Sequence, residues 1–325
     1  MTALPAWISA ALQHKLENVS RAALRASAQA ISERYRAGGS SDIIRSELDA
    51  LAYAVARMPA TYAAVRAALA WSGEIIPEFA PRSLLDAGAG PGTASWAARD
   101  AWPSLQRATL IDRNAHLLAL ARQLHDKTGS SLAMTAIEAD VAMIGDKPRA
   151  DVVLASYALT ELAPTAWQSA LSRLWDLSDR LLVIVEPGTM AGFERVLQYR
   201  NFLLARNARI VAPCSHEGTC PLADSARWCH FNARLPRSRD HLFAKDADVP
   251  YEDEKFSYLV AGKGFGELAR GRRVLATPKV SKAGVALTLC GPNVTDERVI
   301  ARRDKDAYRA AKRLGWGDTI SDRSS

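Results

Sequence analysis

The sequence predicts an α/β protein in which a mainly parallel sheet is preceded by a helical N-terminal cap and followed by a small basic segment that contains strands. Three observations predict this. From residue 81 onward, short apolar runs alternate with helix-like segments, which is typical of βαβ units. A glycine-rich loop follows the first of these runs. Three of the four cysteines fall within residues 213–231, in a loop-like insertion.

The composition is that of an ordinary globular protein, with 325 residues, 48% of them hydrophobic and 24% charged. We expect a helical region over residues 1–78, an α/β domain over 79–262 with a cysteine-rich insertion at about 211–254, and a basic segment over 263–325. No apolar run approaches the roughly 18 residues of a membrane span, so no membrane partner is expected. The first residues lack the features of a secretory signal, and we therefore expect a soluble cytoplasmic protein.

Apolar residues recur at helical spacing in two N-terminal stretches, which are Leu24, Ala28, Ile31 and Tyr35, and then Ile44, Leu48, Leu51 and Val55. Gly38 follows the first stretch where a helix C-cap belongs. Pro59 is expected to interrupt the second helix.

The strands and helices of the α/β domain follow in alternation. The expected strands are SLLDAGAG, ATLIDRN, IEADV, DVVLASYALTEL and LLVIVEPGT, and the expected helices are HLLALARQLHDK, WQSALSRLWDLS and GFERVLQYRNFLLAR. The insertion then reads as a loop to about Glu254. Beyond it, KFSYLVAGK, RRVLATPKV and GVALTLCG are expected as strands, and DKDAYRAAKRLGW as a last basic helix.

The glycine-rich loop has the pattern D-x-G-x-G-x-G, formed by Asp86, Gly88, Gly90 and Gly92. Glycines at these positions let the backbone turn sharply and approach a ligand, and the helix that follows offers free N–H groups. A dinucleotide fingerprint would need glycine at position 93, which is Thr93, and there is no GK[ST] of a phosphate-binding P-loop.

This loop resembles the S-adenosylmethionine-binding loop of the Rossmann-like methyltransferases. The resemblance implies that Asp86 and the glycines hold the methionine moiety and that residues 79–262 are a methyltransferase domain. It implies further cofactor contacts from Asp112 to the ribose hydroxyls, from Asp140 at the end of the third strand to the adenine, and from Ser156 at the end of the fourth strand.

No catalytic residue is assigned, because methyl transfer needs little beyond in-line positioning of the acceptor. The end of the fourth strand contains neither the N/D-P-P-Y motif of methyltransferases that act on adenine or cytosine nor a cysteine. Tyr157 and Glu161 lie there and could contact an acceptor or serve in packing, and for Glu161 we favour packing. Activity is therefore left open.

The four cysteines, Cys214, Cys220, Cys229 and Cys290, lack the C-x-x-C spacing of structural zinc sites and the spacings of ferredoxins. Ordinary buried cysteines and a metal site both remain open on spacing alone. A metal site is favoured because three cysteines share one loop and Cys290 could return to complete the shell. His216 and His230 are near enough in the sequence to be substitute ligands.

The net charge of +7 is concentrated at the C-terminal end, where residues 263–325 contain 14 Lys and Arg against 7 Asp and Glu. Such a concentration is typical of a protein with a polyanionic partner, although a solvated basic tail is the alternative.

An ordered set of motifs resembles the ribosomal small-subunit Rsm family of methyltransferase-like proteins, found in bacteria and as a mitochondrial ribosome assembly factor. The motifs are Y-x-x-x-RMPATY from Tyr53, LLDAGAGPGTASWA, SYALTEL, VEPGT, APC at Cys214, CPL at Cys220, WCHF at Cys229 and LCGP at Cys290. The resemblance extends over nearly the whole chain, from about residue 20 to 318. One departure is Ser215 before His216, where the family usually has proline.

The resemblance implies an S-adenosylmethionine-dependent methyltransferase-like protein that acts on the small ribosomal subunit or its rRNA, in ribosome assembly and translation. It implies a four-iron four-sulfur cluster on Cys214, Cys220, Cys229 and Cys290, with zinc as the alternative. The expected partner is rRNA and no DNA is expected. A non-catalytic assembly factor and a small-molecule methyltransferase are the alternative functions.

Overall fold

A computed structural model describes residues 1–127, 131–145, 148–292 and 294–321. The chain falls into two compact units. Unit 1 comprises Met1–Ala67, Ala80–Val183 and Ala233–Glu254, and unit 2 comprises Ala68–Phe79, Ile184–Asn232 and Lys255–Ser325. The division of the sequence into a helical region (1–78), an α/β domain (79–262) and a basic segment (263–325) stays a prediction. Over the described residues, no helix combines the length and the apolar character that a membrane crossing requires.

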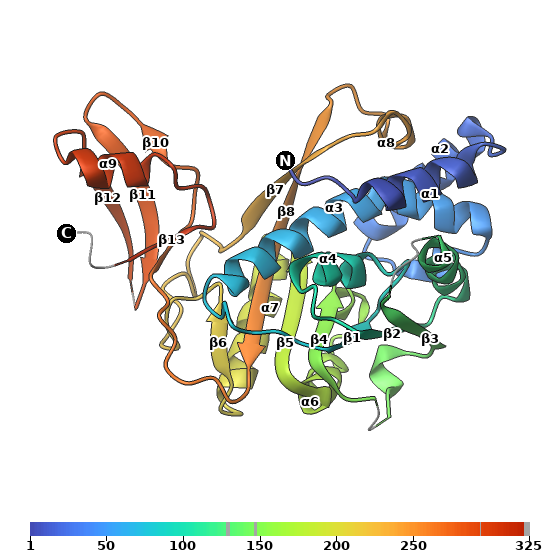
Figure 1. Ribbon diagram of the computed structural model, residues 1–325, viewed down its shortest axis with the longest axis horizontal. Coiled ribbons are helices and arrows are strands. Elements are labelled where there is room, and N and C mark those ends of the chain that lie inside the picture. Colours follow the sequence, from blue (N-terminus) through green and yellow to red (C-terminus); the bar gives the residue numbers. More distant parts are fainter. Residues whose placement is uncertain (128–130, 146–147, 293, 322–325) are drawn as a thin grey trace. The chain divides into compact units, whose positions relative to one another are not determined.

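Unit 1 begins with helices (Figure 1), as the sequence predicts. They are α1 (Ala6–Leu16), α2 (Arg21–Arg36), the 3-10 turn η1 (Ser41–Ile43) and α3 (Glu47–Gly73), which continues into unit 2. The hydroxyl of Ser20 accepts the Ala23 N–H and caps α2, and Gly38 follows that helix with φ +76°. Helix α2 packs against α8 (Arg239–Lys245), where Arg21 pairs with Asp240 at 2.8 Å.

The expectation that Pro59 interrupts the second helix is wrong. Helix α3 runs through Pro59 without a break. A proline inside a helix costs about 3 kcal/mol because it removes a backbone hydrogen bond and clashes with the preceding turn. The neighbours Met58 and Ala60 are both fully buried, so tertiary packing on both sides of the proline offsets this cost.

The sheet of unit 1 has the strand order β3-β2-β1-β4-β5, with β1 to β4 parallel. The strands are β1 (Ser83–Ala87), β2 (Arg107–Asp112), β3 (Ala133–Glu138), β4 (Ala150–Ser156) and β5 (Ser178–Pro187). The helices are α4 (Thr93–Ala101), α5 (Ala115–Asp126) and α6 (Trp167–Leu177), with 3-10 turns η2 (Val141–Met143) and η3 (Leu159–Glu161). The predicted α/β fold with parallel strands is confirmed.

The strand order of the sheet continues as β5-β8-β6, and β7 pairs with β8. The elements here are α7 (Met190–Leu204) and β6 (Arg209–Ala212) of unit 2, together with β7 (Phe231–Pro236) and β8 (Tyr251–Gly262), whose residues are divided between the two units. Strand β6 is antiparallel to β8. The expectation of a loop reaching Glu254 is wrong, because β7, α8 and the start of β8 lie within it. Buried and more exposed residues alternate along β7, which is a strand pattern too short to stand out among the surrounding Arg, Asp and Pro.

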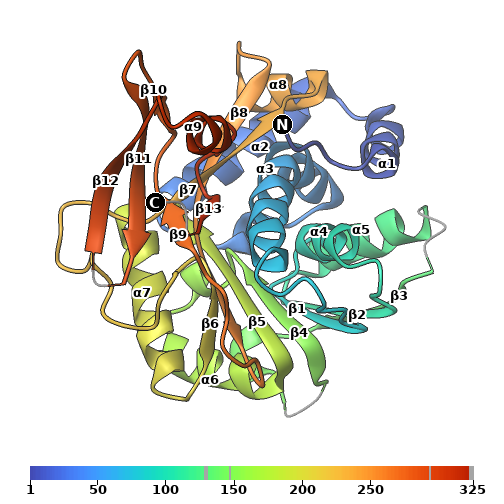
Figure 2. The ribbon, with the colours of Figure 1, turned by 60° about the vertical axis from the view of Figure 1, so that its left-hand side comes forward.

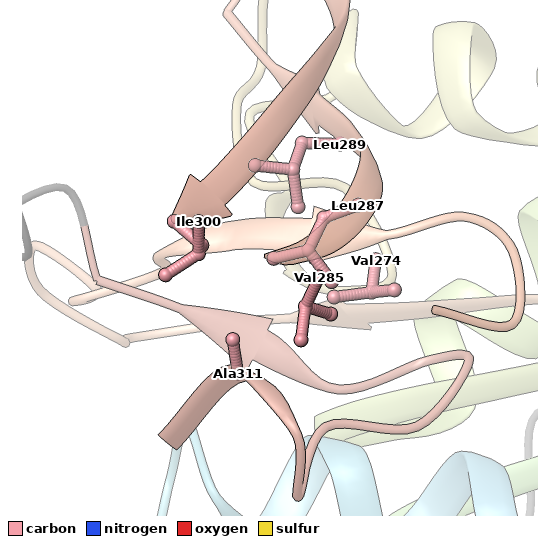
Figure 3. Packing of buried hydrophobic residues seen from close by; sticks show 6 residues of the cluster. All are labelled: Val274, Val285, Leu287, Leu289, Ile300 and Ala311. Atoms are coloured by element: carbon pink, nitrogen blue, oxygen red, sulfur yellow. The ribbon is translucent and has the colours of Figure 1, made fainter. Parts of the chain in front are cut away.

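The C-terminal residues of unit 2 form a second sheet of five strands (Figure 2). It contains β9 (Arg272–Val274), β10 (Lys279–Val280), β11 (Gly284–Gly291), β12 (Val294–Ala301) and β13 (Thr319–Ile320), together with α9 (Lys305–Ala311). Strand β11 presents Val285, Leu287 and Leu289 to a small core that Figure 3 shows with Val274 and Ala311. Because side chains alternate along a strand, Cys290 belongs to the opposite face of β11.

Candidate functional site

The glycine-rich loop adopts a backbone that favours glycine at three positions, since Gly88, Gly90 and Gly92 have φ values of +72°, +53° and +79°. The three differ in what surrounds them. A Cβ on Gly88 would lie 2.3 Å from the Ala158 Cβ, whereas a Cβ on Gly90 would meet only Leu117, at 3.8 Å. Gly88 is therefore packed against protein, and Gly90 faces open space beside the loop.

Asp86 organises the loop from inside the protein. Its side chain is fully buried, and its Oδ2 accepts hydrogen bonds from the Ser95 N–H at 3.0 Å and the Ser95 hydroxyl at 2.7 Å. The carboxylate thus ties the end of β1 to the first turn of α4. Burial raises the pKa of Asp86 to about 7, although the bonds from Ser95 oppose the shift.

This burial predicts a pH dependence that Asp86→Asn removes. The folded pKa of about 7 lies above the ordinary value of 3.8, so the folded state binds more protons between these values and the wild type loses stability as pH rises from 4 to 7. Asp86→Asn, whose amide oxygen can still accept from Ser95, is expected to gain stability relative to the wild type over that window. Urea unfolding of both proteins at pH 4.5, 6 and 7.5 measures the difference. A difference that is constant with pH would contradict it.

Asp112 is the second carboxylate at the loop, and the structure brings it into direct contact with Gly90. Its Oδ2 accepts the Gly90 N–H at 2.7 Å, and its Oδ1 accepts the Asn114 N–H at 2.8 Å. The side chain is buried, and burial raises the pKa of this carboxyl. Each carboxylate oxygen can accept a further hydrogen bond, so Asp112 can hold the loop and still accept from a ligand.

Ser156 lies at the end of β4, and Asp140 lies just beyond the end of β3. The Ser156 hydroxyl, on the last residue of β4, is buried and has no hydrogen-bond partner within the described part of the chain. Buried hydroxyls are rarely left without a partner, so this atom is available to a ligand. Asp140 lies two residues beyond β3 rather than at its end, and its Oδ1 accepts the Ala142 N–H to cap η2.

Sequence reasoning missed the part that the N-terminal helices play beside this loop. The Asn114 side chain donates to the carbonyls of Ser41 and Ile44, at 3.1 and 2.9 Å. Glu161 accepts from the Ser41 N–H and hydroxyl, at 3.1 and 3.2 Å. These bonds join η1 to residues that follow β2 and β4. They span 70 to 120 positions of sequence, and no local pattern indicates them.

The end of the fourth strand is engaged within the protein. Tyr157 has a φ of +57°, and its hydroxyl donates to Glu254 Oε1 at 2.9 Å. Glu254 also pairs with Arg57 of α3 at 3.6 Å. Glu161 is held in the same way by its bonds from Ser41. The sequence left Tyr157 and Glu161 as possible contacts to a methyl acceptor, and these interactions agree instead with a packing role for both.

The second site is a cavity in unit 2 that all four cysteines line, together with Arg200, His216 and Arg273. None of the four cysteines forms a disulfide. Three hydrogen bonds bring their segments together: Ser215 Oγ to the Cys290 carbonyl at 3.1 Å, Ser257 Oγ to the Cys229 carbonyl at 2.8 Å, and Arg273 Nε to the Pro213 carbonyl at 2.9 Å. The predicted return of Cys290 to the cysteine-rich segment is present in the fold.

The thiols of this cavity are disposed to stay protonated when nothing binds them. Burial raises the pKa of Cys290 to about 12, and the pKa values of Cys229 and Cys220 are also raised, chiefly by burial. Over the described residues, no group of three or more His, Cys, Asp or Glu side chains is arranged to hold a single metal ion. The cavity therefore gathers four sulfur donors without forming a ready site for one ion.

The two histidines of the insertion have different surroundings. His216 is buried in the cavity, and its pKa is lowered by burial and by the nearby Arg200 and Arg270. His230 stacks on Trp228 with ring centroids 5.2 Å apart and meets Trp316 edge-on at 4.9 Å. His230 is thus part of an aromatic stack, and only His216 lies where a substitute ligand would have to be.

The basic C-terminal segment does not expose all its charge. Arg270 pairs with Glu217 at 3.1 Å, Arg272 pairs with Asp296 at 2.8 Å, and Arg273 is buried. Among the described residues of this segment, the exposed cations are Lys279, Lys282, Arg302, Arg303, Lys305, Arg309, Lys312 and Arg313. The positive surface therefore lies on the turn between β10 and β11 and around α9.

A family model described as "Rsm22: Mitochondrial small ribosomal subunit Rsm22" matches residues 47–321. The chain belongs to the Rsm22 family. The family that the ordered motifs indicate is thereby confirmed.

Curated relatives of this Rsm22 family member include the human "Ribosome assembly protein METTL17, mitochondrial", which is 28% identical over 288 residues. That alignment covers 83% of this chain and 62% of the human protein. The "Rsm22-cox11 tandem protein 2, mitochondrial" of Schizosaccharomyces pombe is 26% identical over 325 residues, covering 82% of this chain and 42% of that protein. The chain thus spans less than two thirds of the length of these relatives.

Among solved structures, the magnesium protoporphyrin IX methyltransferase of Synechocystis PCC 6803 is similar with a TM-score of 0.42 and 14% identity, over 72% of this chain and 94% of that chain. Likeness at this level is too low to transfer a ligand or an activity.

The expected cytoplasmic location is wrong, because the family description and these relatives are mitochondrial. The cytoplasmic location was expected because the sequence shows neither a secretory signal pattern nor a long apolar run. Proteins of the mitochondrial interior share both absences with cytoplasmic proteins, so these features cannot separate the two compartments.

Proposed function

We propose that this Rsm22 family member binds small-subunit rRNA and takes part in assembly of the small ribosomal subunit. Family membership over residues 47–321 carries the proposal. The human relative is itself named a ribosome assembly protein. The eight exposed cations in the described part of the C-terminal segment add physical support, because a phosphate backbone needs such a surface and a small acceptor molecule does not. The same surface argues against a small-molecule methyltransferase.

The glycine-rich loop is the proposed S-adenosylmethionine site. Three features support it: the open space at Gly90, the remaining acceptor capacity of Asp112, and the buried Ser156 hydroxyl, which has no partner among the described residues. The cofactor is an already activated methyl donor, so the protein would need to place an acceptor in line with it. Asp86 would shape the loop through Ser95 rather than bind the ligand, and a contact of Asp140 with adenine stays a prediction.

A non-catalytic assembly factor is the second candidate. One observation favours it: Tyr157 and Glu161, two polar side chains after β4, both form hydrogen bonds with other parts of unit 1. Deleting the protein in cells and measuring rRNA methylation and subunit assembly together separates the candidates. Loss of one methylated nucleotide selects methyl transfer, and defective assembly with unchanged methylation selects the non-catalytic form.

An iron–sulfur cluster on the four cysteines is the proposed metal group. A zinc ion with four thiolates needs the sulfurs about 3.8 Å apart, as bonds of about 2.3 Å in a tetrahedron require. All four thiols line one cavity, which supports a group bound by four thiolates, and the described residues show no arrangement that already holds a single ion. When bound, a cluster would link the segments of Cys214 and Cys220, of Cys229 and of Cys290 through metal–sulfur bonds. Residues of this chain supply those thiolates, and His216 is the histidine that lines the cavity.

The proposed RNA surface predicts a salt-dependent affinity that charge reversal weakens. The double variant Lys305→Glu, Arg313→Glu changes two exposed cations at α9, and the slope of log affinity against log salt is expected to become shallower by about one for each phosphate that the variant no longer neutralises. Filter binding of a small-subunit rRNA fragment at several salt concentrations measures it. Arg34→Glu, Arg36→Glu on exposed α2 is the control with the same charge change. An equal weakening in both variants would contradict the assignment to α9.

A further inference from the structure

Two arginines of the cysteine cavity are almost completely buried. Arg200 of α7 and Arg273 of β9 line the cavity, with exposed fractions of 3% and 2%. An ionised group that leaves water without an opposite charge is costly, so buried arginines are normally paired with carboxylates or other anions. The partners of these two side chains are therefore informative.

Within the described part of the chain, the hydrogen bonds of both guanidinium groups go to neutral oxygens. Arg273 donates to the carbonyls of Pro213 at 2.9 Å and Gly317 at 2.7 Å. Arg200 donates to the carbonyls of His216 at 3.1 Å and Gly218 at 2.7 Å, and to the Asn201 side chain at 3.4 Å. Its Nε is buried with no partner among the described residues.

Other arginines of unit 2 show the contrast. Arg195 pairs with Glu186 at 3.0 Å, Arg270 with Glu217 at 3.1 Å and Arg272 with Asp296 at 2.8 Å. Within the described ranges, neither Arg200 nor Arg273 forms such a pair with a carboxylate. Arg273 is close enough to Glu74 to lower the pKa of that carboxyl, although burial still raises that pKa overall and no ion pair forms between the two side chains. Two positive charges are therefore buried beside the cysteines without an ion pair to a carboxylate of the described residues.

The cysteines are the groups positioned to supply that anion. Cys290 of β11 lies directly opposite Arg273 of β9 in the antiparallel pairing, in which the Cβ atoms of opposed residues are about 5 Å apart. Arg273 also holds the carbonyl of Pro213, the residue before Cys214. Arg200 holds the loop between Cys214 and Cys220 by two of its carbonyls.

Protonated thiols cannot offset these charges, but metal-bound thiolates can. Four thiolates around a doubly charged metal core leave a net charge of about minus two, for a zinc ion and for a cluster alike. We propose that Arg200 and Arg273 are the counter-charges of a net-anionic metal–thiolate group held by Cys214, Cys220, Cys229 and Cys290. They are positioning residues that make the cavity select an anionic occupant. This inference rests on the metal site of the proposed function.

Two consequences follow for the protein. Without metal, unit 2 keeps two buried cations that form no ion pair with a carboxylate of the described residues, so we expect metal binding to stabilise the folded form of this unit. With a cluster bound, the two positive charges and the Arg200 Nε–H favour the more negative, reduced state and raise its reduction potential.

The test compares removal of charge with its retention at both positions in the full chain purified anaerobically. Arg200→Gln and Arg273→Gln remove the charge, and Arg200→Lys and Arg273→Lys keep it. Arg206→Gln removes an exposed arginine just beyond α7 that does not line the cavity, and serves as the matched control. Metal content, the rate of metal release to a chelator and the Tm of metal-bound and metal-free protein are measured for each.

The Gln variants are expected to release metal at least tenfold faster and to show a smaller rise of Tm on metal binding, whereas the Lys variants and Arg206→Gln stay close to the wild type. If iron and sulfide are present, the Gln variants also have a more negative potential, by about 59 mV for a tenfold change in a one-electron equilibrium. A Gln variant that fails to fold while the Lys variant at that position folds also supports the charge requirement.

Equal losses of metal in the Lys and Gln variants would show that the arginines act only as hydrogen-bond donors, and would overturn the proposal. Unchanged metal retention in the Gln variants would overturn it as well. In both cases the wild type still holds metal, so the metal site itself survives. A wild type that holds no metal overturns the metal site and the counter-charge role together.

Discussion

Gly90→Arg is expected to abolish S-adenosylmethionine binding while leaving the fold intact, with affinity at least 100-fold lower, about 2.7 kcal/mol. The position is open to added atoms, since a Cβ there would meet only Leu117 at 3.8 Å. The arginine side chain would therefore extend into the space proposed for the cofactor rather than clash with protein. Isothermal titration of the purified variant with S-adenosylmethionine measures the loss.

Two further glycine variants make this experiment specific. Gly38→Arg changes a glycine of the same unit that also has a positive φ, +76°, and no atoms within 4 Å of its Cβ position. It carries the same backbone strain away from the loop and is expected to bind normally. Gly88→Val is expected to unfold unit 1, because its Cβ would lie 2.3 Å from that of Ala158. Normal binding by a folded Gly90→Arg protein would disprove the proposed cofactor site.

Cys229→Ser is the second change with a large expected effect. The Cys229 sulfur is strongly disfavoured as a free thiolate, because burial and the charges of the other three cysteines all raise its pKa. A bound metal reverses this preference by stabilising the thiolate. Replacing this donor should reduce metal affinity by more than the roughly 10–100-fold that is typical of losing a residue that only supports a metal ligand, and should lower the Tm.

Iron, acid-labile sulfide and zinc analysis after anaerobic purification measures this loss. Ala226→Ser introduces a serine at an exposed position of the same segment, outside the cavity, and should retain the metal. If the wild type contains iron and sulfide in equal amounts, the bound group is an iron–sulfur cluster. If it contains zinc without sulfide, the bound group is a zinc ion. A wild type without metal, or a Cys229→Ser protein that keeps it, would end the four-thiolate proposal.

Much of unit 1 could be predicted from local pattern. The apolar runs that become β1, β2, β4 and β5 are short, bounded by turns and separated by segments with helical periodicity, so both their type and their order could be read directly. The glycine loop was equally predictable, because only glycine readily tolerates three positive φ values within five residues. Pro59 shows the limit of such reasoning. Its local cost is real, yet the stabilisation from burial on either side of it in α3 is greater.

The interactions that give the candidate sites their chemistry could not be predicted in the same way. Asp112 could be assigned to the loop by its distance along the chain, but its bond to the Gly90 N–H depends on the parallel pairing of β1 with β2. The residues of and beside η1 form hydrogen bonds with Asn114 and Glu161, and no sequence pattern indicates that these distant segments lie close together. The basic composition of the last residues was plain, but which arginines form ion pairs was not.

By itself the sequence determined the α/β class, the glycine loop with its carboxylates, the family and the four candidate sulfur donors, because each depends on residue type, local periodicity or short spacing. Only the tertiary structure decided that Cys290 and the three earlier cysteines line one cavity, and that Arg200 and Arg273 are buried beside them without an ion pair to a carboxylate of the described residues. The physical reason is that burial and charge compensation depend on which distant segments pack together, and this follows from the strand pairing of β9 and β11 rather than from any local stretch of the chain.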